Sequence, residues 1–103
     1  MARNTADENQ IKRDTEKARF TREREVNDLR KILAIPEGRR FIWRYIGISG
    51  VFKLSFTGNS ETFFNEGQRN VGLKLIADVM EANPESYLQM TKEAEEEEKK
   101  TNV

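Results

Sequence analysis

Large apolar side chains are concentrated in the middle of this chain, and this limits the size of the core that it can form. Residues 1–28 hold few of them beyond Ile11, Phe20 and Val26, and residues 91–103 hold almost none. The part that can fold by burying apolar surface is therefore roughly sixty residues long, a size at which a single core is marginal. Either the flanking segments pack as helices, or the protein depends on a partner.

We therefore divide the chain into three parts. Residues 1–27 are predicted to form a charged N-terminal helical extension, residues 28–90 a helical domain, and residues 91–103 an acidic C-terminal tail. The net charge at pH 7 is zero, but residues 1–44 carry a net charge of +4 and residues 45–103 a net charge of −4. This asymmetry favours head-to-tail self-association, or an acidic partner for the first half.

Proline marks two helix starts in a fold that we predict to be all-α, a small bundle of three to four helices with charged, partly exposed ends. In "AIPEGRR" and "ANPE", Pro36 and Pro84 suit the first position of a helix, and Asn83 can cap the second of these helices. The apolar spacing predicts helices over 5–34, 36–47, 61–82 and 84–98.

The core prediction follows apolar residues that recur three and four positions apart. The predicted core residues are Leu29, Ile32, Leu33, Phe41, Ile42, Tyr45, Ile46, Phe64, Val71, Leu75, Ile76, Val79 and Leu88. The segment "VFKLSF" (51–56) alternates with a period of two but has no second strand to pair with. We predict a loop or short helix there that lays its aromatic residues on the core, followed by a turn in which Gly58 permits positive φ and Asn59 or Ser60 caps the next helix.

The stretch "FTGNSETFFNEGQRNVG" (56–72) weakens the helix that it begins, because each glycine costs about 1 kcal/mol against alanine in a helix interior. In one interpretation Gly72 lets Trp43 or a neighbouring backbone come close, and Gln68 bonds a loop carbonyl. In the other, the stretch presents a partner-binding patch. Its members would be Phe63, Asn65, Gly67, Gln68 and Arg69.

The residue types present give little support for enzyme activity or for a metal site. The chain has no Cys and no His, which excludes disulfides, thiol chemistry and cysteine-bound zinc. The consecutive glutamates 95–98 point in different directions on a helix and make a poor cation cage. We expect no catalytic residue, no metal, no cofactor and, for lack of a long apolar run, no transmembrane segment.

Nucleic-acid binding is the alternative function, because "GRRFIWRY" (38–45) mixes arginine with aromatic residues. Acidic residues interspersed among the arginines argue against a continuous basic stripe. The residues that would contact phosphates are Arg13, Arg19, Arg22, Arg24, Arg39, Arg40 and Arg44.

Residues 28–90 resemble a family of small phage proteins encoded near the head and tail genes of short-tailed bacteriophages and prophages, including Bordetella phages. The resemblance lies in "IPEGRRFIWR", "SFTGNSETFFNEGQRNVG" and "EANPESYL". It implies a phage protein in the bacterial host cytoplasm during infection or in the virion, with a virion or assembly role and a phage structural or assembly protein, or a second copy, as its partner. It supplies no catalytic residue, and it strengthens the partner-binding interpretation of residues 56–72.

Overall fold

Over residues 5–101, four helices follow one another at nearly the bounds that the sequence predicts. The structure, a computed structural model, describes residues 5–101. Its helices are α1 (Thr5–Leu33), α2 (Pro36–Ile48), α3 (Glu61–Ala82) and α4 (Pro84–Thr101). No strand occurs among these residues, which confirms the all-α prediction. The predicted extension 1–27 and tail 91–103 each include residues outside the described range, namely 1–4 and 102–103.

The two proline-containing segments begin helices as predicted. Ile35 is extended (φ −115°, ψ 144°), and Pro36 follows as the first residue of α2. Asn83 is also extended (φ −165°, ψ 97°), and its Oδ1 accepts a hydrogen bond of 3.1 Å from the backbone N–H of Glu85. This bond confirms Asn83 as the cap of α4, which continues to Thr101 where the sequence predicted an end near residue 98.

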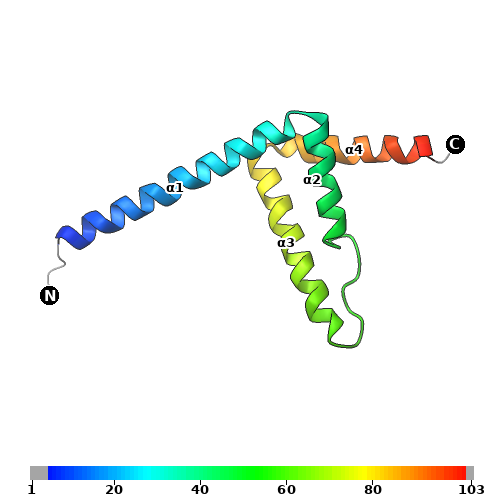
Figure 1. The fold of residues 1–103 in the computed structure, drawn as a ribbon, viewed down its shortest axis with the longest axis horizontal. Coiled ribbons are helices and arrows are strands. Elements are labelled where there is room, and N and C mark those ends of the chain that lie inside the picture. Colours follow the sequence, from blue (N-terminus) through cyan, green and yellow to red (C-terminus); the bar gives the residue numbers. More distant parts are fainter. Residues whose placement is uncertain (1–4, 102–103) are drawn as a thin grey trace.

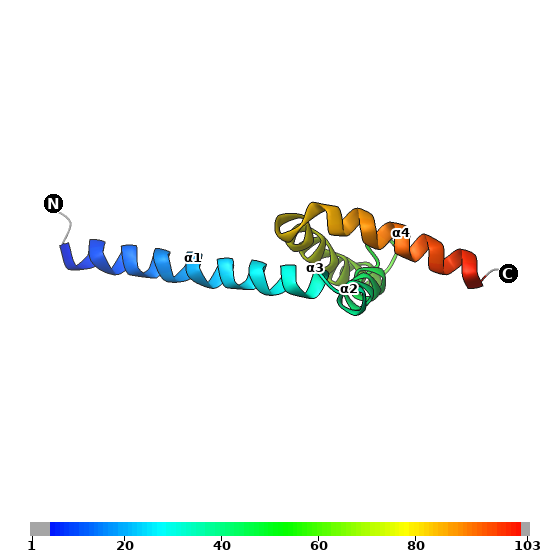
Figure 2. The same ribbon diagram turned by 90° about the horizontal axis from the view of Figure 1, so that it is seen from above.

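The helices form a thin, extended molecule measuring 71 × 40 × 15 Å along its principal axes. α2 and α3 lie side by side as an antiparallel hairpin, while α1 and α4 project in opposite directions from its base (Figure 1). Seen from above, α4 lies on one side of the α2–α3 pair, and the first half of α1 extends away from the other helices (Figure 2). Every described residue before Thr21 is exposed, so that half of α1 is an unsupported arm.

A small core lies where the four helices meet. Its buried apolar residues are Leu33, Ile42, Ile46, Val79, Ala82 and Met90. Half-buried side chains surround them, among them Trp43 and Tyr87, whose ring centroids are 6.0 Å apart. Each helix contributes to this core, which is why a chain with so few buried residues still holds four helices together.

The predicted core was wrong at six positions. The exposed members are Ile32, Phe41, Tyr45, Phe64, Val71 and Leu88. The spacing identified apolar faces correctly, but it does not say whether a neighbouring element covers a given face. It also missed Ala82 and Met90, which are buried because α3 and α4 meet at those positions.

Gly72 has the packing role that one interpretation gave it. A Cβ at Gly72 would collide with the side chains of Ser49 and Val51, so the glycine lets the end of α2 and the following loop approach α3. The close neighbours are therefore these two side chains and not Trp43 or a backbone segment.

Arg39 joins three helices at the base of the hairpin. It is 8% exposed; its Nε donates a hydrogen bond of 2.7 Å to Glu93 in α4, and its NH1 donates one of 2.9 Å to the carbonyl of Leu33 at the end of α1. The preceding residue, Gly38, permits this approach, because a Cβ there would meet the carbonyl of Ile32. A charged side chain thus closes the junction of α1, α2 and α4.

A second polar contact fixes the direction of α1. Arg22 forms ion pairs with Asp78, at 2.7 Å, and with Glu81, both in α3. Hydrogen bonds to Glu81 and Asp78 raise the pKa of the Arg22 guanidinium, which stays protonated. Arg30 adds a hydrogen bond of 2.8 Å to the carbonyl of Ala82. These contacts hold the second half of α1 against the end of α3.

None of the helices described over residues 5–101 combines the length and the apolar character that a membrane span requires.

Replacing Ile46 tests the position of the core. Ile46 is fully buried, so Ile46→Ala should lower the free energy of unfolding by about 2–5 kcal/mol through lost burial and the cavity left behind. Leu88→Ala, on an exposed part of α4, should change it by less than about 0.5 kcal/mol. Urea unfolding followed by circular dichroism measures both. Equal losses would contradict this assignment of the core.

Replacing Arg39 tests the charged junction. Arg39→Met keeps most of the apolar stem but removes both hydrogen bonds, and should cost about 1.5–3 kcal/mol because Glu93 and the Leu33 carbonyl lose their partner. The matched control is Arg40→Met, since Arg40 is exposed and its 3.6 Å pair with Glu37 is worth less than about 1 kcal/mol. If both variants unfold at the same urea concentration, Arg39 does not have this role.

Candidate partner-binding site

The free end of the α2–α3 hairpin carries most of the exposed aromatic residues of the domain. The loop of residues 49–60 and the first turn of α3 form this end, far from the junction with α1 and α4 (Figure 1). Its exposed apolar residues, which we call the tip residues, are Phe52, Leu54, Phe56, Phe63 and Phe64. They are 61–87% exposed, so apolar burial does not explain why the hairpin end has this composition.

Polar contacts hold the outer part of the loop in place, whereas Val51 near its start packs against the core. Asn65 donates a hydrogen bond of 3.2 Å to the carbonyl of Ser55, and the Ser55 hydroxyl donates one to the Glu66 carboxylate. The backbone N–H of Thr57 donates to the hydroxyl of Thr62 at 3.0 Å. The loop is therefore tied to the first turns of α3, and its apolar side chains are presented on an ordered backbone.

The turn into α3 confirms one prediction and decides another. Gly58 has φ +80°, the left-handed region that favours glycine. Asn59, not Ser60, is the capping side chain, because its Oδ1 accepts a hydrogen bond of 2.9 Å from the backbone N–H of Glu61. "VFKLSF" is a loop, as expected, but its aromatic residues do not lie on the core.

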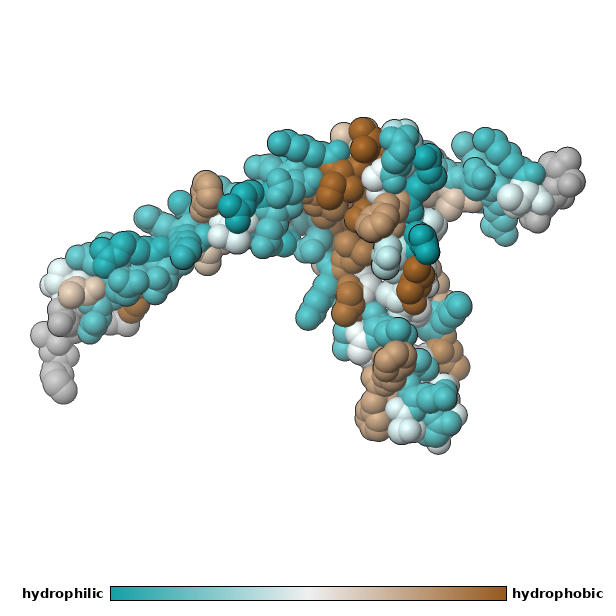
Figure 3. All heavy atoms as spheres, viewed as in Figure 1, coloured by the Kyte–Doolittle hydropathy of each residue, from teal (hydrophilic) through white to brown (hydrophobic). Residues whose placement is uncertain are grey.

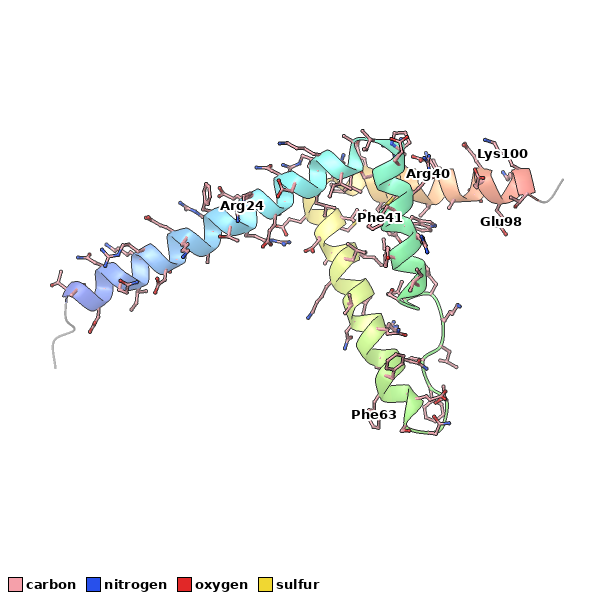
Figure 4. All side chains as sticks on the ribbon, in the orientation of Figure 1. Arg24, Arg40, Phe41, Phe63, Glu98 and Lys100 are labelled. Atoms are coloured by element: carbon pink, nitrogen blue, oxygen red, sulfur yellow. The ribbon has the colours of Figure 1, made fainter. Side chains whose placement is uncertain are left out.

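The five predicted partner-binding residues differ in their exposure and in the contacts that they make. Phe63 is 82% exposed and extends from the end of α3 (Figure 4), and Gly67 has no atom within 4 Å of the place where a Cβ would stand. Asn65 is used in holding the loop, a contact that we had expected from Gln68. Gln68 instead lines a small cavity against the loop, and Arg69 is half-buried. Phe63, Gly67 and Gln68 are thus the exposed members of the set, and Asn65 and Arg69 are half-buried.

Sequence reasoning missed the loop half of this surface. We expected Phe52, Leu54 and Phe56 to cover the core, yet only Phe52 lies near it, with its ring centroid 5.8 Å from that of Trp43. The sequence feature that indicates the exposure of these loop residues is the alternation of apolar residues in a segment that has no second strand to pair with. Such a segment cannot bury both of its faces, and here Val51 and Ser55 on one face are half-buried, whereas the face of the loop's tip residues is exposed.

The seven arginines proposed for nucleic-acid binding do not form one surface. Arg39 is buried and Arg22 is paired with two carboxylates. Arg24 lies on α1 and Arg40 on α2, well separated (Figure 4). On the arm, Arg19 lies 3.9 Å from Glu23.

Three of these arginines line a groove between α2 and α4. The groove has a volume of about 620 Å³, with Trp43 and Met90 among its lining residues. Arg39, Arg40 and Arg44 also line it, together with several glutamates of α4 that would repel a phosphate backbone. Among the described residues, moreover, no group of acidic side chains converges to hold a metal ion.

Comparison with known proteins yields one match. A protein-family model described as "Bbp19-like phage protein" matches residues 29–92, which include α2, α3, the loop between them and the end of α1 that packs on them. No curated protein and no solved structure matches the chain. The matched range contains both the core and the tip residues.

Proposed function

The chain belongs to the Bbp19-like phage proteins, and from this premise we propose that it is a non-enzymatic virion-associated or assembly protein that docks a phage protein through the hairpin tip. It would act in the host cytoplasm during infection and, if its partner is packaged, in the virion. The single observation that carries the proposal is the set of tip residues, exposed on a loop that is fixed by hydrogen bonds.

The tip has the properties of a protein-binding surface. Aromatic side chains dominate the energetics of protein interfaces because they bury a large area at a low cost in side-chain entropy. A loop already tied to α3 by Asn65 and Thr62 loses little further entropy when a partner binds. The absence of covering side chains around Gly67 leaves room for a partner to lie close to the helix.

A protein partner fits these observations better than nucleic acid does. Stacking on bases needs aromatic residues beside cationic ones that track the phosphates. The nearest positive side chains in sequence to the tip residues are Lys53 and Arg69, and Arg69 is half-buried. The larger arginine set lies on α1 and α2, where carboxylates accompany it.

Removing two tip residues tests the proposal. Leu54→Ala combined with Phe63→Ala should leave the melting temperature nearly unchanged, because both side chains are more than 80% exposed. It should abolish recovery of the head, portal or ejection proteins that the unmodified chain captures from an infected lysate. Phe20→Ala, which removes an exposed aromatic residue from the α1 arm, is the matched control and should capture normally.

Two outcomes would contradict the proposal. In the first, the unmodified chain is missing from purified virions and also captures no phage structural protein. In the second, the double variant captures its partner as well as the Phe20→Ala control does.

A pair of glycine substitutions separates partner approach from packing inside the domain. Gly67→Ala should stabilise the chain by up to about 1 kcal/mol, since the new methyl group meets nothing, while weakening partner capture. Gly72→Ala should destabilise it, because its methyl group collides with Ser49 and Val51. Thermal unfolding and capture, measured on both variants, check this. Unchanged capture by Gly67→Ala would remove Gly67 from the binding surface.

A further inference from the structure

One face of the α2–α3 pair is covered only at the base of the hairpin, where the end of α1 packs on α3 and α2. α4 lies on the opposite side of the pair (Figure 2), and the molecule is only 15 Å thick along its shortest axis. We call the uncovered side the open face and define it by five residues that are each more than 40% exposed. These are Ile32, Phe41, Tyr45, Ile48 and Val71.

Three of these residues form a stripe along α2. Phe41, Tyr45 and Ile48 are spaced at i, i+4 and i+7, so they share one side of the helix, turned away from the buried Ile42 and Ile46. The rings of Phe41 and Tyr45 are 5.0 Å apart, which makes the stripe continuous. This is the spacing with which an amphipathic helix binds a groove or another helix.

The stripe continues onto the neighbouring helices. The Ile32 carbonyl and side chain lie against Gly38, one turn before Phe41 on the same side of α2. Ile32 also lines, with Leu75, a groove between α1 and α3, and Val71 lies one turn before Leu75 on α3. Apolar atoms accordingly gather over the end of α1, over α2 and down α3 in one view of the surface (Figure 3).

The chain exposes more area than a compact monomer of this mass does. A compact monomeric protein of 12.0 kDa exposes about 6,000 Å². This chain exposes 8268 Å², an excess of about 2,300 Å². A standard interface needs only about 800 Å² from each partner, and obligate homodimers bury about 2,000–5,000 Å² in total. The excess, to which the arm and the tip also contribute, is larger than the area that one partner gives to a standard interface.

We propose that the open face is covered by the same face of a second copy, related by a two-fold axis. An isologous contact needs one surface that complements itself, and a flat apolar stripe satisfies this condition. The net charge of zero removes long-range repulsion between copies. A core of only six buried apolar residues is also one that oligomerisation commonly supplements in small domains. This dimer does not depend on the partner of the tip.

Mass measurement tests the dimer. The purified full chain should sediment with twice its 12.0 kDa mass at micromolar concentration. Val71→Glu should give the monomer mass while keeping its helical circular dichroism, because burying an unpaired carboxylate in the interface is unfavourable whereas Val71 is exposed in the single chain. Leu88→Glu, a charge of the same kind at an exposed site on α4, should stay dimeric.

Cysteine cross-linking tests the symmetry and does not depend on a destabilising variant. The chain has no cysteine, so a single Tyr45→Cys or Phe41→Cys substitution introduces the only thiol. A two-fold axis through the stripe brings equivalent residues together, and at least one of these variants should form a disulfide-linked dimer on mild oxidation. Leu88→Cys should remain mostly monomeric on a denaturing gel.

Three outcomes would overturn the proposal. They are a monomer mass at all concentrations, a dimer that Val71→Glu leaves intact, and cross-linking no greater for the stripe than for Leu88→Cys. A mass that grows beyond the dimer with concentration would show the head-to-tail association that the charge asymmetry favours. The tip variant Leu54→Ala with Phe63→Ala should keep the dimer mass, so failure of the dimer and failure of tip docking can be told apart.

Discussion

The buried guanidinium of Arg39 is the contact on which the arrangement of the helices depends. It joins α2 to a carboxylate of α4 and to the last backbone carbonyl of α1, next to Gly38, where α2 lies close against the end of α1. An apolar residue there would fill the space but would leave that carbonyl and Glu93 unpaired. A charge network of this kind fixes the directions of helices more strictly than apolar contacts alone, because hydrogen bonds have preferred geometry. The opposed directions of α1 and α4 follow from it.

The thin shape has a physical consequence for stability. With one small core at the junction, the hairpin tip gains little from apolar burial within the chain, and the exposed α1 arm gains none. The tip has side-chain hydrogen bonds between the loop and α3, whereas the arm is supported by contacts along its own helix, such as that of Gln10 with Asp14 at 2.9 Å. Isolated helices of this length are marginal in water. The free energy of local unfolding should therefore be lower at the tip and at the arm than at the junction.

The sequence allowed the helices to be predicted well and their packing only in part. Pro36, Pro84 and Asn83 act through local geometry, which depends on neighbouring residues alone, and all three behave as predicted. The burial of a side chain depends on which helices pack together, and the spacing of apolar residues along one helix does not show this. Phe41 and Ile42 look equally suited to a core, yet the first is 58% and the second 8% exposed, because α3 and α4 meet only one side of α2. The same limit applies to the candidate site. Phe63 could be proposed from its place at the start of a predicted helix, whereas the exposure of Leu54 and Phe56 depends on the path that the loop takes.

The separation of the exposed surfaces gives the molecule its most distinctive property. The open face lies along the hairpin, and the tip lies at its end, so a copy bound to the first need not block a partner on the second. A two-fold dimer would carry two tips. Two weak contacts of these tips with a phage structure built of repeated subunits would act together. Effective concentration then raises the overall affinity without any new contact, provided that the spacing of the tips matches the spacing of the partner sites. A rigid hairpin suits this requirement better than a flexible linker, because its hydrogen-bonded loop and the Arg39 junction fix the position of the tip relative to the open face.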